Sequence, residues 1–293
     1  MGHLDGKVAL VTGAGGGLGR THALLLAKEG AAVVVNDLGG SRDGKGASSS
    51  MADQVVAEIR AAGGRAVADY GSVTDPAAAR RMVQVAVENF GQLDICICNA
   101  GILRDKSFKN MTDELWDTVL DVHLRGTYLV TKAAYDQMIA QGKGGRIILT
   151  SSTSGLLGNF GQTNYGAAKA GIAGLMRCLW LEAAKYGITV NALAPTALSR
   201  LTDDVLPDDK KKELAPDKVS PAVVWLCSDA AKDVTGRHFL VAGNTVSLLS
   251  WQLATLAEKS EDEAPWDVEA VGEKILASMG EWPPVNPRKR MIK

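Results

Sequence analysis

Short apolar segments alternate along the chain with longer amphipathic ones. The short segments are rich in β-branched residues, and enough chain for one helix lies between most of them. Apolar strands separated by helices indicate a parallel sheet that is covered on both faces. The pattern therefore predicts an α/β, doubly wound fold with a seven-stranded parallel sheet, its strands at residues 8–11, 32–36, 65–69, 93–98, 146–151, 188–193 and 238–241.

Two segments depart from this alternation. Residues 39–50 are rich in Gly and Ser, which predicts a surface loop after the second strand. Beyond the last predicted strand, the chain predicts a helix over 267–279 and irregular structure around three later prolines. We therefore expect a single domain over residues 1–243, followed by a C-terminal extension over 244–293.

Charge and hydropathy narrow the class of partner. The chain carries 32 basic and 33 acidic residues with no long run of either sign, which argues against nucleic acid and an anionic membrane surface. No apolar run approaches the roughly 18 residues of a membrane helix, and the start of the chain lacks the pattern of a signal peptide. We expect a cytoplasmic protein with a small-molecule partner.

The cysteines give no sign of a metal site or a disulfide framework. The four of them, Cys96, Cys98, Cys178 and Cys227, include no CxxC pair. We expect Cys96 and Cys98 to point to opposite faces of one strand. We interpret all four as reduced core residues.

A glycine cluster follows the first strand directly and precedes a helical run over residues 20–29. Residues 12–19 read TGAGGGLG. Such glycines let the backbone turn tightly and approach a pyrophosphate, whose charge is stabilised by amides at the helix N-terminus. Between a strand and a helix, this turn predicts dinucleotide binding in a Rossmann-type fold, with contacts from Gly13, Gly17, Leu18 and Gly19.

Asp37 ends the second strand, about twenty residues after the glycine turn. There a carboxylate can accept both ribose hydroxyls of NAD and repel the additional phosphate of NADP, so NAD is the expected cofactor. Two alternatives stay open. Asp37 could be a helix cap or a loop residue, and Arg42 and Lys45 in the following loop could reach the phosphate of NADP.

Tyr165 and Lys169 lie four residues apart at the start of a predicted helix, and therefore on one face. A lysine ammonium there can lower the pKa of the phenol and hold the nicotinamide ribose. Ser152 stands at the C-terminal end of the fifth strand, where its hydroxyl could orient a substrate oxygen. Ser151 and Ser154 compete for that role, and we interpret them as packing and loop residues. The trio predicts hydride transfer between a nicotinamide and a secondary alcohol or ketone.

Together these motifs resemble the short-chain dehydrogenase/reductase family, from residue 4 to about residue 243. The resemblance implies that Ser152, Tyr165 and Lys169 are catalytic. It also implies that residues from several strand ends contact the cofactor, namely Ser72, Val73, Asn99, Ala100, Gly101, Tyr165, Lys169, Pro195 and Ala197.

Three positions depart from the family pattern. His123 replaces an Asn whose backbone carbonyl anchors a proton-relay water in the family, and we interpret it as a buried structural residue rather than a direct acid or base. Gly71 stands where an Asp usually touches adenine, and Asp69 is an alternative residue for that contact. Thr196 replaces a Gly beside the carboxamide site. The polar segment 197–217 predicts a lid over the substrate or, alternatively, solvated surface.

A narrower resemblance lies in VVNDLGG, NAGILRDKSF, VHLRGTY, TSSTSGLLGNFGQTNYGAAK and VVWLCSD, which are similar to the dehydrogenase part of the peroxisomal multifunctional enzymes type 2. It implies oxidation of (3R)-3-hydroxyacyl-CoA to 3-ketoacyl-CoA, a homodimer or homotetramer, and an extension, including Trp251, that packs on the core or the dimer partner. Because hydratase and sterol-carrier parts are missing, we expect a stand-alone dehydrogenase. Alternatives are a steroid or xenobiotic alcohol dehydrogenase and a non-catalytic nucleotide-binding scaffold.

Overall fold

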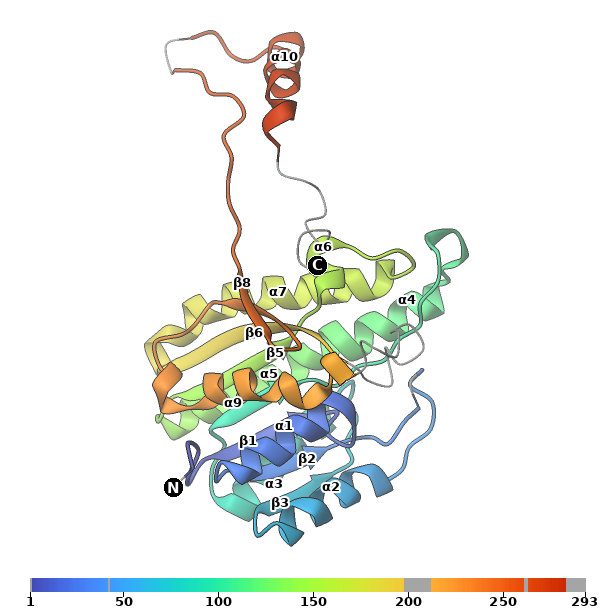
Figure 1. Ribbon diagram of the computed structural model, residues 1–293, viewed down its shortest axis with the longest axis vertical. Coiled ribbons are helices and arrows are strands. Elements are labelled where there is room, and N and C mark those ends of the chain that lie inside the picture. Colours follow the sequence, from blue (N-terminus) through green and yellow to red (C-terminus); the bar gives the residue numbers. More distant parts are fainter. Residues whose placement is uncertain (1, 42, 198–211, 261–262, 283–293) are drawn as a thin grey trace. The chain divides into compact units, whose positions relative to one another are not determined.

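The computed structural model describes residues 2–41, 43–197, 212–260 and 263–282. Its contacts divide the chain into two units, Met1–Leu249 and Ser250–Lys293. The first unit contains the sheet and the helices that cover it (Figure 1).

The sheet has eight strands in the order β3-β2-β1-β4-β5-β6-β7-β8. Seven of them pair in parallel: β1 (Val8–Thr12), β2 (Ala32–Asn36), β3 (Arg65–Asp69), β4 (Ile95–Cys98), β5 (Gly145–Thr150), β6 (Ile188–Thr196) and β7 (His238–Ala242). Each overlaps one predicted strand, so the doubly wound α/β fold is confirmed. The expected count of seven is corrected to eight, because β8 (Thr245–Leu249) returns antiparallel to β7 after a tight turn.

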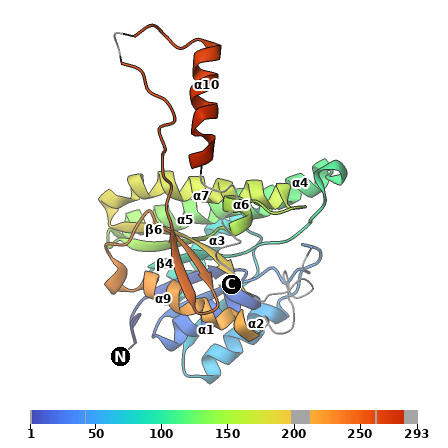
Figure 2. The same cartoon turned by 45° about the horizontal axis from the view of Figure 1, so that its top comes forward.

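Helices cover both faces of the sheet, which is why the central strands are apolar at every position (Figures 1 and 2). One apolar core lies beneath α1 (Gly17–Lys28), α2 (Ser50–Ala61) and α9 (Ser220–Cys227). The other lies beneath α3 (Pro76–Phe90), α5 (Gly126–Gln141) and α7 (Thr163–Ala183). Shorter helices, α4 (Asp113–Leu120) and α6 (Thr153–Leu157), lie at the carboxyl end of the strands. A π-helical turn, Asp121–Arg125, joins α4 to α5.

The strand order reverses between β1 and β4. The chain runs from β1 outward to β2 and β3, and then returns to place β4 on the other side of β1. In a doubly wound sheet, such a reversal opens a crevice at the carboxyl ends of the strands, where ligands bind. The glycine turn follows β1 and the Asn99 segment follows β4, so both line this position.

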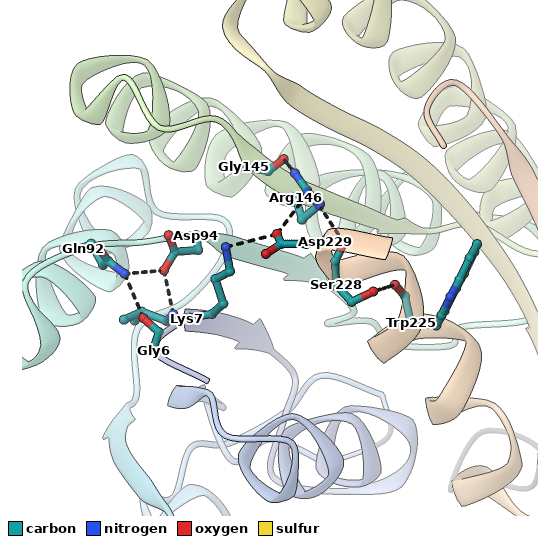
Figure 3. A network of polar contacts seen from close by, with 10 residues as sticks. Gly6, Lys7, Gln92, Asp94, Gly145, Arg146, Trp225, Ser228 and Asp229 are labelled. Carbon is teal, nitrogen blue, oxygen red and sulfur yellow. Dashed lines mark hydrogen bonds and ion pairs between the residues drawn. The ribbon is translucent and has the colours of Figure 1, made fainter. Parts of the chain in front are cut away.

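A polar network lies at the amino ends of the central strands, away from the glycine turn at their carboxyl ends (Figure 3). Asp94 Oδ2 accepts a hydrogen bond from the backbone N–H of Val8 at 2.7 Å. Asp229 lies between two cations, with its Oδ1 3.2 Å from Lys7 Nζ and 3.5 Å from an Arg146 guanidinium nitrogen. Because Asp229 is exposed, each pair contributes at most about 1 kcal/mol. The network joins the amino ends of the strands and leaves the carboxyl ends to the site.

The cysteine side chains correct one expectation. Cys96 and Cys98 are both buried in one apolar core, and their Sγ atoms lie 3.9 Å apart. The prediction of opposite faces was wrong, because side chains two residues apart along a strand share a face. Cys227 is also buried, whereas Cys178 is exposed and therefore not a core residue.

The second unit contains one longer helix, α10 (Val268–Ser278), within the predicted range. Asp267 caps it, since its Oδ1 accepts a hydrogen bond from Ala270 N at 2.8 Å. In neither unit do the described residues form a helix long and apolar enough to cross a membrane. Nor do His, Cys, Asp and Glu side chains of the described residues gather in a group of three or more that could hold a metal ion.

Candidate active site

The turn after β1 approaches the end of β4 closely. Gly13 has a φ of +63°, and a Cβ on it would lie 2.7 Å from Ala100 Cα, so only glycine fits. A Cβ on Gly19 would lie 2.1 Å from a backbone oxygen. Helix α1 begins at Gly17, and its N-cap Gly16 makes no side-chain capping bond, so the first amides can face an anion. This cradle fits the pyrophosphate of a dinucleotide.

Thr12 and Asn99 lock the glycine turn to the end of β4. The Asn99 amide donates to Thr12 O at 3.1 Å and to Gly13 O at 3.2 Å. The backbone N–H groups of Asn99 and Ala100 both donate to Thr12 Oγ1, at 3.0 and 3.1 Å. The sequence analysis missed Thr12, although a hydroxyl at the end of a buried apolar strand was a signal.

Asp37 is buried at the end of β2 and holds two loops. Its Oδ2 accepts from Gly15 N and its Oδ1 from Gly39 N, both at 2.7 Å. The alternative of a loop residue therefore describes part of its role. Each carboxylate oxygen still has a second lone pair, so a ribose contact is compatible with these bonds and stays a prediction.

The adenine side of the site is built differently from the family pattern. Asp69 Oδ1 accepts from Asn36 Nδ2 at 2.7 Å and from Gly71 N at 3.0 Å, so this oxygen stabilises the strand ends. Ser72 is half-buried and Val73 is buried just beyond β3. Their contacts to a cofactor stay predictions.

Ser152, Tyr165 and Lys169 meet above the end of β5. Ser152 N-caps α6 by accepting from Ser154 N at 3.1 Å, which holds its hydroxyl at the strand end. The Ser152 hydroxyl lies near enough to Tyr165, in the first turn of α7, to lower the pKa of its phenol. Lys169, one turn further along α7, is buried and donates from Nζ to Thr150 O at 2.6 Å. The structure therefore brings the predicted trio together.

Burial dominates the electrostatics of the trio. Burial raises the pKa of Tyr165 to about 12, although the Ser152 hydrogen bond acts in the opposite direction. Burial lowers the pKa of Lys169 to about 7. The net shift of the phenol is therefore opposite to the lowering expected from Lys169, because loss of hydration outweighs the effect of Ser152 and the charge of Asp105 adds to the rise.

The two competing serines have other partners. Ser151 Oγ donates to Lys169 O at 2.9 Å, which ties the strand end to α7. Ser154 Oγ donates to Gln162 Oε1 at 2.8 Å, which ties α6 to the loop before α7. These contacts are the packing and loop roles expected of them, and they leave Ser152 as the serine beside the Tyr165 phenol.

Asn164 is a site residue that the sequence analysis did not single out. Its side chain is fully buried, and its amide donates to Arg104 O and Leu115 O at 3.1 Å each. These bonds fix the start of α7 against α4, and so fix the neighbouring Tyr165. The signal was its position, since Asn164 shares an otherwise apolar helix face with Ala168 four residues later.

Other expected residues lie at the edge of the site or beyond the described chain. Pro195 is in β6, and Ala197 follows it and is buried. Lys45 Nζ forms an ion pair within its own loop, 3.6 Å from a carboxylate oxygen. Residues 198–211 of the expected lid, and Arg42, lie outside the described residues.

Sequence comparisons agree with the geometry. The family model for short chain dehydrogenases matches residues 7–210. The mouse peroxisomal multifunctional enzyme type 2 is 49% identical over 267 residues, which are 91% of this chain and 36% of the mouse protein. The chain thus spans about a third of that relative. A Mycobacterium tuberculosis hydroxyacyl-CoA dehydrogenase is 43% identical over 84% of this chain and 80% of its own.

Solved structures give the same result. A short chain dehydrogenase from Mycobacterium avium has a TM-score of 0.84 and 44% identity, over 97% of this chain and 98% of its own. A short chain dehydrogenase from Mycobacterium paratuberculosis, solved with bound NAD, has a TM-score of 0.75 and 29% identity, over 83% and 98%. With the glycine cradle, the buried lysine and the neighbouring serine and tyrosine in place, the chain belongs to the short-chain dehydrogenase family of oxidoreductases.

Proposed function

We propose that this chain oxidises the alcohol of a (3R)-3-hydroxyacyl-CoA to the 3-ketone, with Ser152, Tyr165 and Lys169 as its catalytic residues. The observation that supports this most is the cluster of the three side chains: the Ser152 hydroxyl lies near enough to lower the pKa of the Tyr165 phenol, and Lys169 Nζ lies 5.5 Å from the Tyr165 ring centroid. Two neighbouring hydroxyls can together bind one alcohol oxygen.

NAD is the cofactor. The family is that of the short chain dehydrogenases, and the Mycobacterium paratuberculosis member of similar fold holds NAD. The glycine cradle would hold the pyrophosphate, Asp37 the adenosine ribose and Lys169 the nicotinamide ribose. When bound, NAD supplies the hydride acceptor and a positive charge beside the phenol.

The residues of the chain handle the alcohol proton. Ser152 donates a hydrogen bond to the substrate oxygen and orients it. Tyr165, as phenolate, takes the proton of the hydroxyl while the carbon loses its hydride. Lys169 stabilises the phenolate by its charge. In the reverse direction, Tyr165 returns the proton to the forming alcohol.

The substrate class is supported by the relatives. The hydroxyacyl-CoA dehydrogenase of Mycobacterium tuberculosis aligns over 80% of its own length. The mouse multifunctional enzyme aligns over 36% of its length, so its further activities do not enter the proposal.

A substrate panel tests the proposal. NADH formation is measured with (3R)- and (3S)-3-hydroxyacyl-CoA, hydroxysteroids and simple secondary alcohols. The proposal requires the highest kcat/KM for the (3R) thioester. A higher value for a steroid would favour a steroid dehydrogenase, and no NADH with any alcohol would favour the non-catalytic scaffold.

The last part of the proposal concerns the oligomeric state, the cell compartment and the C-terminal extension. We propose a homodimer or homotetramer in the cytoplasm, with the 244–293 extension packed on the core or on the partner. Sedimentation of the full chain, compared with a chain that ends at residue 249, tests the oligomeric state and the part that the extension has in it. A monomer in both cases would contradict them.

A further inference from the structure

His123 is a buried imidazole that contacts two parts of the active site. Its side chain lies in the π-helical turn between α4 and α5, and is 1% exposed. Its ring is edge-to-face with the Tyr165 ring, with 5.1 Å between the centroids and an angle of 85°. A Cβ on Gly101 would lie 2.2 Å from His123 Cε1, so this glycine leaves room for the ring. The imidazole therefore lies between the catalytic tyrosine and the cofactor-side loop.

The contacts of Nε2 decide the tautomer. Nε2 lies 2.7 Å from Ile102 O, and the backbone N–H of Ile102 points to the same nitrogen at 3.1 Å. One tautomer cannot satisfy both contacts. Two lone pairs at the shorter distance would repel each other most strongly, so we assign the proton to Nε2, where it lies between the ring and the carbonyl oxygen. Burial and the charge of Lys169 lower the pKa of His123 to about 3, so the ring is neutral. His123 thus donates from Nε2 and carries its lone pair on Nδ1.

No donor among the described residues forms a hydrogen bond with the Nδ1 lone pair. Nδ1 is buried and has no hydrogen-bond partner there. A buried acceptor without a donor costs free energy, so we expect an N–H or O–H donor near Nδ1. Lys169 Nζ is a candidate source, because the ammonium has three hydrogens and donates one to Thr150 O. Its charge is also near enough to act on His123.

We propose that His123 is a positioning residue for the proton-transfer pair, its Nδ1 accepting a hydrogen bond from the Lys169 side, either from Nζ or from a water bound to Nζ. The proposal rests on the proposed function, because it gives His123 a task in that same site. The imidazole holds the Tyr165 ring by its edge-to-face contact and directs the Lys169 ammonium by its Nδ1 acceptor. Its side chain, and not only its backbone, then contributes to turnover.

Two substitutions of His123 distinguish the contribution of Nδ1 from that of Nε2. The side-chain amide of asparagine reaches as far as Nδ1 of histidine, and that of glutamine reaches as far as Nε2. His123→Asn therefore keeps an acceptor at Nδ1, whereas His123→Gln keeps the contact to Ile102 only. Both remove the ring contact with Tyr165, so the comparison isolates the acceptor. His238→Gln is the control, since His238 is another buried histidine, in β7.

The readout is kcat for oxidation of (3R)-3-hydroxydecanoyl-CoA, with the NADH dissociation constant and the melting temperature of each variant. We expect His123→Asn to stay within about threefold of the unchanged chain and His123→Gln to lose about tenfold or more, which is the effect of one well-placed hydrogen bond. NADH affinity should stay the same in both. Equal kcat in the two variants, at any level, or the opposite order would overturn the proposal.

A measurement on the unchanged chain does not depend on how the variants fold. Imidazole ¹⁵N NMR of the chain reports which nitrogen carries the proton. The proposal requires the proton on Nε2 and an Nδ1 that accepts a hydrogen bond. A proton on Nδ1 would overturn it. If the unchanged chain forms no NADH while the NMR result holds, the proposed function fails and the assignment of the Nδ1 contact survives.

Discussion

Lys169 Nζ lies 5.5 Å from the centroid of the Tyr165 ring, so the ammonium faces the phenol directly. Burial moves both groups toward their neutral forms, with pKa values of about 7 for Lys169 and about 12 for Tyr165. In the protein without cofactor, the phenol is therefore protonated at neutral pH. A positive charge added beside the pair favours the phenolate, which links proton transfer to cofactor binding.

The position of the Ser152 hydroxyl beside the Tyr165 phenol predicts a clear difference between Ser152 and Ser154. Ser152→Ala should lower kcat about a hundredfold, because the substrate oxygen loses a positioned donor. Ser154→Ala should lower kcat less than about fivefold, since Ser154 bonds to Gln162 instead. Steady-state NADH formation checks both. Equal losses would mean that Ser152 acts only as a helix cap.

Asp37 should set the preference for NAD over NADP. Asp37→Asn keeps the size of the side chain and removes its charge, so the ratio of kcat/KM for NADP to that for NAD should rise about tenfold or more. Asp43→Asn is the control, because Asp43 is an acid of the same segment whose carboxylate contacts Ser41 and Lys45 of its own loop. An unchanged ratio in Asp37→Asn would show that Asp37 only holds the loops.

Gly13 should tolerate no side chain. Gly13→Ala places a methyl group 2.7 Å from Ala100 Cα in addition to its positive φ, and should both weaken NADH binding and cost about 3 kcal/mol of unfolding free energy. Gly91→Ala is matched, because Gly91 has a φ of +84° and no atom within 4 Å of its Cβ position. It should cost only about 1 kcal/mol. Urea unfolding measures the stability of the two variants, and titration measures their affinity for NADH. Similar losses in Gly13→Ala and Gly91→Ala would refute the steric argument.

Three buried histidines predict a loss of stability in acid. Burial lowers the pKa of His22 and His238 from 6.5 to about 4, and that of His123 to about 3. As pH falls below 6.5, the unfolded chain binds protons that the folded chain does not, so stability present above 6.5 is lost on the way to pH 4. Each histidine adds a slope of up to about 1.4 kcal/mol per pH unit.

Urea unfolding at pH 7 and pH 5 measures this effect. The free energy of unfolding should fall at pH 5, and His238→Gln should reduce the fall because one titrating group is removed. A free energy that is the same at both values would contradict the predicted linkage.

The sheet was predictable because its strands are short, apolar and bounded by turns. The predicted and observed limits of β2 and β3 coincide. Strand β8 was missed, although Gly243 and Asn244 stand between two apolar runs as in a two-residue hairpin. Residues 244–249 were assigned to the C-terminal extension instead.

The site was predictable as far as its residues follow local motifs. The proximity of Ser152, Tyr165 and Lys169 could be predicted from strand ends and helix spacing. Thr12 and Asn164 could not be assigned in this way, since their roles are contacts with segments far away in the sequence. The direction of the Tyr165 pKa shift also depends on burial, which spacing alone does not reveal.

The most direct test of the central claim is the turnover of Tyr165→Phe. NADH formation from (3R)-3-hydroxyacyl-CoA and the NADH dissociation constant are measured beside Tyr135→Phe, a control whose hydroxyl lies away from the site and reaches Glu182 O at 3.5 Å. We expect Tyr165→Phe to keep its NADH affinity and lose about a thousandfold in kcat, with little change in the control. A Tyr165→Phe variant that turns over within about threefold of the unchanged chain would contradict the account.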